Sequence, residues 1–551
     1  MITRTVDVDS VQGTSVDNPG DHGQGQGEAG ADIRPYVEVE VGTAAAAGAG
    51  HGVGVDGLDR GSRLAEGPRA VLVGVVGGRH VLTDDVARAG RAGGLSYLDL
   101  LSHHRDGDGP QWPDAVVTPA DPDQVQAVLT VCREQDLAVV PFGGGTSVVG
   151  GVAALRGPKS AVIALDLHRL DRLVSLDATS WVAVLQAGVR GPDAERLLAA
   201  NGFTLGHVPQ SFERATIGGF AVTRSAGQAS SGYGRFEDMV HGVRLATPAG
   251  EWRLGRAPAS AAGPDLLRLV IGSEGAFGVV TEVTVRVRPV PTHRRYEGLV
   301  IDGWQRGVDA IRALAQGRVL ADVTRLSDAA ETDLGLALSG GVKTALVRRY
   351  LRARGVREPC LLVLGWEGGS DREVAARRAA TLRVLRRWRP VSLGAAAGNR
   401  WRHGRFAGPR QRDALMAADV CVETLETAAR WSALPGLAAG VRAALHGALG
   451  PAVVMCHVSH AYETGASLYF TVLAPRSPDD PVGQWRRAKD AASEAIMANA
   501  GTITHHHAVG VDHQPWLSTE IGDLGIDVLR AVKRTLDPTG VMNPGKLLRF
   551  E

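Results

Sequence analysis

The sequence predicts an α+β protein that consists of two successive mixed domains. Strand and helix patterns alternate from residue 113 onward and are separated by glycine-rich loops. Beyond residue 295 the pattern changes to longer, arginine-bearing helices mixed with apolar strands. The 551 residues, of which 44% are hydrophobic, also exceed what one hydrophobic core accommodates. We therefore expect a first domain built on a β-α-β unit and a second domain in which helices back a sheet.

The β-α-β unit of the first domain is predicted from its strand and cap residues. Residues 114–117 and 137–142 are short apolar runs of strand type. Between them Asp121 can cap a helix whose first position is Pro122. An earlier strand is expected in AVLVGVV at residues 70–76. The later elements of this domain are strands at 161–167, 181–189 and 280–291, and a helix at 192–202.

The second domain and the chain ends complete the organisation. We expect a helix at 372–388, strands at 359–366 and 466–474, and a final helix at 523–538. The first 65 residues carry few large apolar side chains and are expected to be disordered. Residues 52–57 match GxGxxG, but no strand precedes them and no helix follows, so this match is interpreted as a low-complexity accident. The predicted parts are 1–65 (tail), 66–110 (a segment packed on the first domain), 111–292 (first domain), 293–515 (second domain) and 516–551 (a helical segment returning to the first domain).

Composition and charge exclude several classes of protein. Lys and Arg number 60 against 59 Asp and Glu, and this balance argues against a nucleic-acid binder. The four cysteines have neither metal-binding spacing nor the density of a disulfide framework. No apolar run is long enough to span a bilayer, the first residues do not resemble a signal peptide, and KLLRFE at the end is not a peroxisomal address. We expect a cytoplasmic protein.

Three glycine-rich loops are the sequence's main functional signal. The first, PFGGGTSVVGG at 141–151, directly follows a strand and can point consecutive backbone N–H groups into one concavity. It lacks the Lys of a nucleotide-triphosphate loop, and taken alone it could equally be a flexible turn. Two further loops, at 210–227 and 272–282, follow within about 140 residues. Three donor-rich loops suit a long diphosphate ligand such as a flavin dinucleotide.

These loops carry a family resemblance. PFGGGTSVVGG, TIGGFAVTRSAGQASSGYGRFEDMV and GSEGAFGVVTEVTVRVRP resemble the FAD-binding domain of the vanillyl-alcohol oxidase and p-cresol methylhydroxylase flavoproteins. Among these, the likeness over roughly residues 110–548 is nearest to the alkyldihydroxyacetonephosphate synthases, the ether-lipid enzymes. The resemblance implies the two-subdomain FAD-binding fold at 111–292 and an αβ cap domain with an antiparallel sheet at 293–515, where substrate binds.

The resemblance also implies which residues hold FAD. By position, the cofactor-binding residues are Pro141, Gly143, Gly144, Gly145, Thr146, Ser147, Gln210, Ser211, Thr216, Gly219, Thr223, Ser225, Glu274 and Val280. Covalent members of the family tether the flavin through a His or Cys. The loop at 141–151 contains neither, which favours non-covalent binding, although a tether elsewhere, for example at His207, stays open.

Three places match the catalytic site of the synthases. The run His505-His506-His507 is the ether-lipid pattern, and histidine suits proton transfer near neutral pH. Tyr462 matches the tyrosine to which the synthases assign acid/base chemistry. It would need cationic neighbours to act as a base, and the histidine cluster and an arginine could supply them. Arg325 matches an arginine required for activity, and Arg412 matches one that contacts substrate.

Each of these assignments has a plainer alternative. The histidines could be a polar loop cluster or, less favourably on a strand, a metal site, and no metal is predicted. Tyr462 could be a core tyrosine, and either arginine could be a surface charge.

The implied reaction replaces the acyl chain of acyl-dihydroxyacetone phosphate by a fatty alcohol through a flavin N5 adduct, without net redox change. The alternative in the same fold is an FAD-dependent oxidase or dehydrogenase of a 2-hydroxy acid such as D-lactate or glycolate. A flavin-binding sensor without turnover is a third interpretation, which the polar cluster disfavours.

Two further hypotheses concern partners. The protein could form a homodimer, and the basic stretch 372–389 could contact a membrane surface. The plainer interpretation of that stretch is a solvated helix face.

Overall fold

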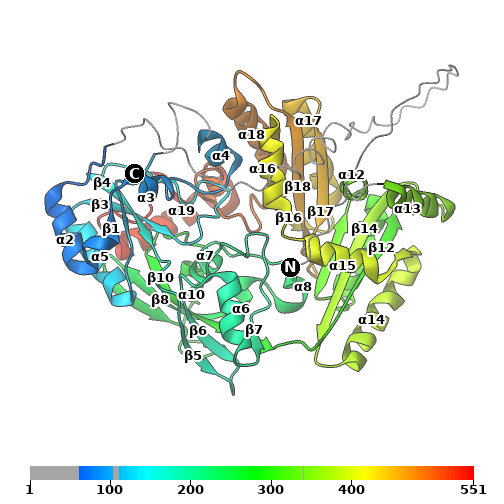
Figure 1. Ribbon diagram of the computed structural model, residues 1–551, viewed down its shortest axis with the longest axis horizontal. Coiled ribbons are helices and arrows are strands. Elements are labelled where there is room, and N and C mark those ends of the chain that lie inside the picture. The colour runs from blue at the N-terminus through cyan, green and yellow to red at the C-terminus, as the bar shows by residue number, and fades with distance from the viewer. Residues whose placement is uncertain (1–60, 104–110, 339–340, 551) are drawn as a thin grey trace, which may run out of the picture.

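The computed structural model describes residues 61–103, 111–338 and 341–550. The predicted tail therefore lies outside the described residues except for 61–65, and the motif at 52–57 lies wholly outside them. The described chain contains three main sheets with helices around them (Figure 1).

The first sheet contains the predicted β-α-β unit. Its strand order is β1-β2-β4-β3, with β2, β4 and β3 parallel and β1 antiparallel. The Asp121 side chain accepts a hydrogen bond from the Gln124 N–H at the start of α5, which confirms the predicted cap. The elements are β1 (Val81–Leu82), α3 (Asp85–Ala89), α4 (Tyr97–His103), β2 (Ala115–Val117), α5 (Pro122–Glu134), β3 (Leu137–Phe142) and β4 (Ala161–Asp166).

The strand predicted at residues 70–76 is wrong, because this segment is part of helix α2 (Glu66–Val76), which is followed by η1 (Gly78–His80). A short apolar run cannot by itself distinguish a buried strand from a buried helix. Here Leu72 and Val76, four residues apart, are the buried face, and α2 packs against α5.

The second sheet is antiparallel, with the order β5-β6-β10-β8-β9, and it shares one apolar core with the first. Its strands are β5 (Leu173–Asp177), β6 (Val182–Gln186), β8 (Val240–Thr247), β9 (Gly250–Leu254) and β10 (Val279–Arg286). Short helices and a two-stranded pair join them: α6 (Gly191–Ala199), α7 (Ile217–Val222), α8 (Ser230–Tyr233), α9 (Phe236–Met239), α10 (Leu267–Val270), β7 (Phe203–Thr204) and β11 (Arg288–Pro289).

The third sheet is the antiparallel cap sheet, which stands beside the first two (Figure 1). Its order is β15-β12-β14-β13-β17-β18-β16. The strands are β12 (His293–Asp302), β13 (Val323–Ser327), β14 (Pro359–Gly368), β15 (Val391–Leu393), β16 (Val420–Arg430), β17 (Val453–Val458) and β18 (Gly465–Pro475). The helices are α11 (Trp304–Gln316), α12 (Ala329–Ala337), α13 (Gly341–Ala353), α14 (Asp371–Leu385), η2 (Arg386–Trp388), α15 (Gly394–Gly404), α16 (Gly408–Ala417), α17 (Leu434–Leu449) and α18 (Pro481–Ala498).

The two faces of the cap sheet have different neighbours. On β18, Leu468, Phe470 and Val472 belong to the core shared with α11, α14, α17 and α18, whereas Tyr469 and Thr471 line a cavity. This alternation follows from the two-residue period of a strand. The sheet therefore presents every second side chain to the cavity.

The end of the chain returns to the first sheet, as expected for the C-terminal segment. After η3 (Gln514–Trp516) and α19 (Leu517–Leu536), Met542 bridges Val139 of β3, and Asn543 N–H donates to the Val139 carbonyl oxygen. The residue boundaries given above for the parts stay predictions. Across the described ranges we find no helix with the length and apolar character needed to cross a membrane.

Candidate active site

A cavity of about 1370 Å³ lies between the loops of the first domain and the inner face of the cap sheet. This exceeds the roughly 300–1,000 Å³ of ordinary small-molecule pockets and leaves room for a dinucleotide and a second ligand. Every residue predicted to bind the cofactor lines it: Pro141, Gly143, Gly144, Gly145, Thr146, Ser147, Gln210, Ser211, Thr216, Gly219, Thr223, Ser225, Glu274 and Val280. Of the predicted catalytic and substrate residues, Arg325, Arg412, His506 and His507 also line it, whereas Tyr462 and His505 do not.

The glycine loop after β3 is a cradle of backbone donors. Among the described residues, no protein atom accepts a hydrogen bond from the N–H groups of residues 144–148. A Cβ at Gly144 would lie 2.1 Å from the Arg214 carbonyl oxygen, and one at Gly143 would lie 2.4 Å from Thr216 Oγ1. The loop thus packs directly on the second glycine loop, where Thr216 caps α7. Free N–H groups in such a concavity fit a diphosphate.

Glu274, in the third loop, binds backbone instead of offering a free carboxylate. It has a left-handed φ of 52°, and its carboxylate accepts the N–H groups of Val509 at 2.8 Å and Gly510 at 2.7 Å. Burial raises the pKa of Glu274 to about 7, against the lowering effect of these two bonds. The loop that lines the cofactor side of the cavity is therefore tied to the segment that follows the three histidines.

His207 does not reach the cavity. It is fully buried between Phe220 and Phe236, and its Nε2 lies 3.0 Å from Ser225 Oγ. Among the described residues, no cysteine lines the cavity. His207 is therefore not placed to tether a flavin in the cavity, although four other histidines, His457, His460, His506 and His507, line it. Non-covalent binding stays a prediction.

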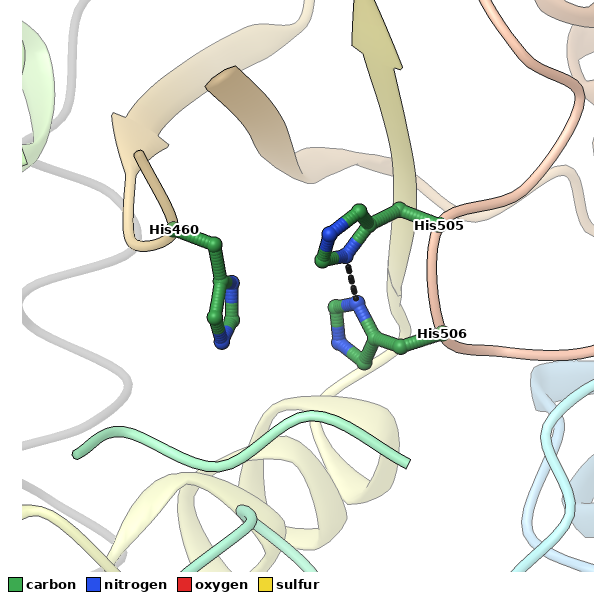
Figure 2. A group of neighbouring side chains, drawn as sticks. All are labelled: His460, His505 and His506. Atoms are coloured by element: carbon green, nitrogen blue, oxygen red, sulfur yellow. Dashed lines mark hydrogen bonds between the residues drawn. The ribbon is translucent and has the colours of Figure 1, made fainter. Parts of the chain in front are cut away.

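Three histidine side chains face one another beside the cavity (Figure 2). His505 and His506 come from a segment outside helices and strands, and their Nδ1 atoms are 3.0 Å apart. His460, which follows β17, contacts the Gly227 carbonyl oxygen through Nε2 at 3.1 Å. Sequence reasoning missed His460, although it lies two residues before Tyr462. Its role depends on a contact 233 residues away in the chain, which no local pattern indicates.

The nitrogen atoms of this trio lie within 4.8 Å of one another, a spacing that a metal ion could use. However, His460 Nδ1 contacts Ser459 and Ser467, and His505 Nε2 contacts the Tyr462 hydroxyl at 2.7 Å. The rings of His460 and His505 thus bond protein groups through both nitrogens, so we interpret the trio as a hydrogen-bonded cluster.

The charges around Tyr462 differ from the sequence expectation of a cationic histidine cluster. Desolvation is the largest effect on His460 and His507 and lowers the pKa of each to about 3, and it lowers the pKa of His505 well below its usual range. Desolvation also raises the pKa of Tyr462, although 36% of its surface is exposed. The cation that opposes this rise is Arg235, which donates to the His505 carbonyl oxygen at 2.7 Å.

Glu426, on β16, is a second residue that sequence reasoning missed. It is 2% exposed, and its carboxylate accepts the N–H groups of His505, His506 and His507. Burial alone would raise its pKa, but the electrostatic interaction with His506 and the hydrogen bond between the two side chains hold the pKa of Glu426 well below the usual value. β16 carries two glutamates, Glu423 and Glu426, and the local sequence does not distinguish the one that has this role.

The two predicted arginines occupy different walls of the cavity. Arg325, on β13, donates to Glu331 Oε1 at 2.7 Å, and its Nη2 lies 2.9 Å from His457 Nδ1. Burial alone would raise the pKa of Glu331, but Arg325 and then His457 hold it below its usual range. Arg412, on α16, donates to the Leu95 carbonyl oxygen at 2.7 Å. Its buried Nε makes no hydrogen bond among the described residues and lies 3.8 Å from Asp413 Oδ1.

Comparison with known proteins gives the class first. Residues 113–255 match the family model described as "FAD binding domain", and residues 290–547 match "FAD linked oxidases, C-terminal domain". With the donor cradle and the adjoining cavity, this pair of domains defines an FAD-dependent flavoenzyme.

Individual relatives then give the family. An alkyldihydroxyacetonephosphate synthase from Trypanosoma brucei brucei is 32% identical over 485 residues, covering 84% of this chain and 78% of the relative. A solved alkyldihydroxyacetonephosphate synthase has a TM-score of 0.77 at 26% identity, covering 90% of this chain and 88% of that one. The chain belongs to the alkyldihydroxyacetonephosphate synthase family. A p-cresol methylhydroxylase with a TM-score of 0.68 at 14% identity, covering 88% of this chain and 98% of that one, shares the fold, and the predicted fold is confirmed.

Proposed function

We propose that this enzyme exchanges the acyl chain of acyl-dihydroxyacetone phosphate for a fatty alcohol and so forms an ether bond. The observation that carries the proposal is the composition of the cavity's cap end. Apolar side chains from α12, α13 and the cap sheet line it: Val300, Leu334, Leu336, Leu338, Val347, Leu351, Leu361 and Leu393. Burial of each methylene contributes about 0.8 kcal/mol, so this wall favours a long alkyl chain. A 2-hydroxy acid of two or three carbons would leave it unfilled.

The chain's own residues have separate tasks in this proposal. When bound, FAD supplies the ring at which the ketone-phosphate carbon is held and activated. Arg325 and Arg412 bind the substrate phosphate, since a guanidinium makes paired hydrogen bonds to phosphate oxygens. His506, on the cavity wall beside His507, accepts the proton of the incoming alcohol hydroxyl. Tyr462 and His505, which bond each other behind that wall, provide a path for the proton.

The test is a product assay under anaerobic conditions. Purified, FAD-loaded enzyme is given palmitoyl-dihydroxyacetone phosphate and hexadecanol. We expect palmitate and the hexadecyl ether in equal amounts, with the rate rising as the alcohol lengthens from decanol to hexadecanol. Flavin bleaching by D-lactate or glycolate, with no ether formed, would establish the 2-hydroxy-acid alternative and refute the proposal.

We also propose peripheral membrane contact through α13. Its exposed face carries Val342, Leu346 and Tyr350, which are 76%, 50% and 41% exposed, beside exposed basic residues such as Arg349. The opposite face, including Val347, lines the cavity. The basic stretch on α14 is a weaker candidate than the sequence suggested, because two of its guanidinium groups form ion pairs within the protein.

Liposome flotation separates these two surfaces. We expect the wild-type protein to float with vesicles containing anionic lipid, and Leu346→Asp to remain in the dense fraction. The matched charge reversal Arg383→Glu, at an exposed position of α14, should leave flotation unchanged. Loss of flotation with Arg383→Glu alone would assign the contact to α14 and exclude α13.

A further inference from the structure

The segment from Thr504 to Gly510 is folded around two buried carboxylates. Glu274, from the third glycine loop, binds its end through the N–H groups of Val509 and Gly510. Glu426, from β16, binds its beginning through the Thr504 hydroxyl at 2.7 Å and three consecutive backbone N–H groups. Successive backbone N–H groups often form a concavity, or nest, that binds an anion. Here the anion is the carboxylate of Glu426, which belongs to the protein itself. The position of all three histidines thus depends on Glu426.

The two oxygens of Glu426 have different partners. Oε1 accepts from Thr504 and from the N–H groups of His505, His506 and His507, at 2.7 to 3.0 Å. Oε2 accepts from the His505 N–H at 2.8 Å and lies 3.3 Å from His506 Nδ1. His506 is therefore the histidine of the run whose ring contacts this carboxylate.

This contact selects a tautomer. A carboxylate oxygen only accepts hydrogen bonds, so the His506 nitrogen that faces it is the one that carries hydrogen. That same Nδ1 lies 3.0 Å from His505 Nδ1, whose ring is neutral because burial lowers its pKa, and a neutral Nδ1 can accept. The carboxylate therefore favours hydrogen on His506 Nδ1, and the His505 contact is compatible with that tautomer. The other nitrogen, Nε2, is then an acceptor, on a residue that lines the cavity.

We propose that Glu426 is a positioning residue that holds His506 as the Nδ1–H tautomer, so that His506 Nε2 accepts the proton of the alcohol hydroxyl. This inference rests on the proposed function for the identity of the alcohol, but the tautomer itself does not depend on the substrate. The remaining ring contacts of His506 are His460, His507 and Tyr469, with ring centroids 4.8 to 6.1 Å away. Burial favours the neutral form of each. His207 and His457 also interact electrostatically with His506, and burial lowers the pKa of both. The carboxylate of Glu426 is therefore the charged group that contacts the His506 ring.

The variant Glu426→Gln tests the proposal, because an amide nitrogen facing His506 would donate and reverse the tautomer. A misassigned tautomer in a catalytic histidine–carboxylate pair costs up to about 10⁴-fold in kcat, so we expect a loss of at least about 100-fold. KM for both substrates should stay within about threefold, since Arg325 and Arg412 are untouched. The matched control is Glu423→Gln, a buried glutamate on the same strand that accepts the Tyr97 N–H. It should lower the thermal midpoint similarly while keeping kcat within about threefold.

The tautomer is measured directly by ¹⁵N NMR of histidine-labelled, FAD-loaded protein, with His506 assigned from a His506→Gln sample. We expect a protonated Nδ1 in the wild-type protein and a protonated Nε2 in Glu426→Gln. If Glu426→Gln does not fold, the wild-type spectrum alone decides. A wild-type His506 protonated on Nε2, or a Glu426→Gln enzyme with full kcat, would overturn the inference. Failure of the wild-type protein to form an ether would refute the proposed function and leave the tautomer result standing.

Discussion

Among single residues, the buried histidines are groups whose ionisation the fold changes strongly in the range below neutral pH. Desolvation lowers the pKa of His207, His460 and His507 to about 3 and that of His513 to about 4. In the unfolded chain these groups titrate near 6.5. Between about pH 6.5 and the lowered values the unfolded state binds more protons, so acid favours unfolding.

We therefore predict that the thermal midpoint falls as the pH is lowered from 7.5 to 5.5. Each such histidine contributes up to about 1.4 kcal/mol per pH unit below 6.5. Carboxyl groups with raised pKa values act in the opposite direction: Glu274, raised to about 7, and Asp99, Glu195, Asp328 and Glu423. We expect the histidines to prevail, because burial lowers the pKa of His457 and His505 as well. His207→Gln should flatten the pH dependence, measured by calorimetry at a fixed scan rate. An unchanged or higher midpoint at pH 5.5 would contradict the buried, neutral state of these rings.

Arg325 provides a second test at this scale. Arg325→Lys keeps the positive charge but loses the paired geometry toward phosphate and toward Glu331 and His457. A hydrogen bond to a charged group is worth about 1.5–3 kcal/mol, so we expect a 10- to 100-fold loss of kcat/KM. Arg312→Lys, at an exposed position of α11, is the control. Equal kinetics for the two variants would remove Arg325 from the site.

The site residues that could be predicted from the sequence are those that lie in recognisable motifs. The glycine loops, the three histidines and both arginines lie in recognisable patterns, and the structure brings most of them to one cavity. Glu426 and His460 were not predicted. Each acts through partners distant in the chain, and their local sequence contains nothing that indicates those partners.

Among the elements, the loop between β3 and the next strand has a geometry that tolerates little added volume. We predict that Gly144→Ala abolishes FAD binding, because its Cβ would lie 2.1 Å from the Arg214 carbonyl oxygen and displace one glycine loop from the other. Gly74→Ala, in α2, is the control, since a Cβ there meets no atom within 4 Å. Visible absorbance per protein and FAD titration measure the effect. A yellow Gly144→Ala protein with wild-type affinity would refute the cradle.

Elements with explicit end signals were predicted well. The Asp121-Pro122 cap and the strands on either side of α5 were found because turn and cap residues define their limits. The run at 70–76 was assigned to the wrong type because only packing against α5 decides it. The order of strands in the cap sheet follows from long-range pairing and could not be predicted from local pattern.

For the whole molecule, the meeting of a cofactor cradle with an apolar cap cavity determines the substrate. Leu361, on β14, lines the apolar end. We predict that Leu361→Trp shortens this end and shifts the preferred alcohol from hexadecanol toward decanol. Competition between the two alcohols in one reaction measures the shift. Loss of activity with both alcohols in equal proportion would show that Leu361 does not limit chain length.

The most direct measurement for the whole molecule follows the oxygen of the alcohol. Hexadecanol labelled with ¹⁸O is incubated with the FAD-loaded enzyme and unlabelled palmitoyl-dihydroxyacetone phosphate, and both products are analysed by mass spectrometry. If a carbon–oxygen bond at the ketone-phosphate is exchanged, the ether retains the label and the released palmitate contains none. Label appearing in a palmitoyl ester, or hydrogen peroxide formed with no ether, would contradict the assignment.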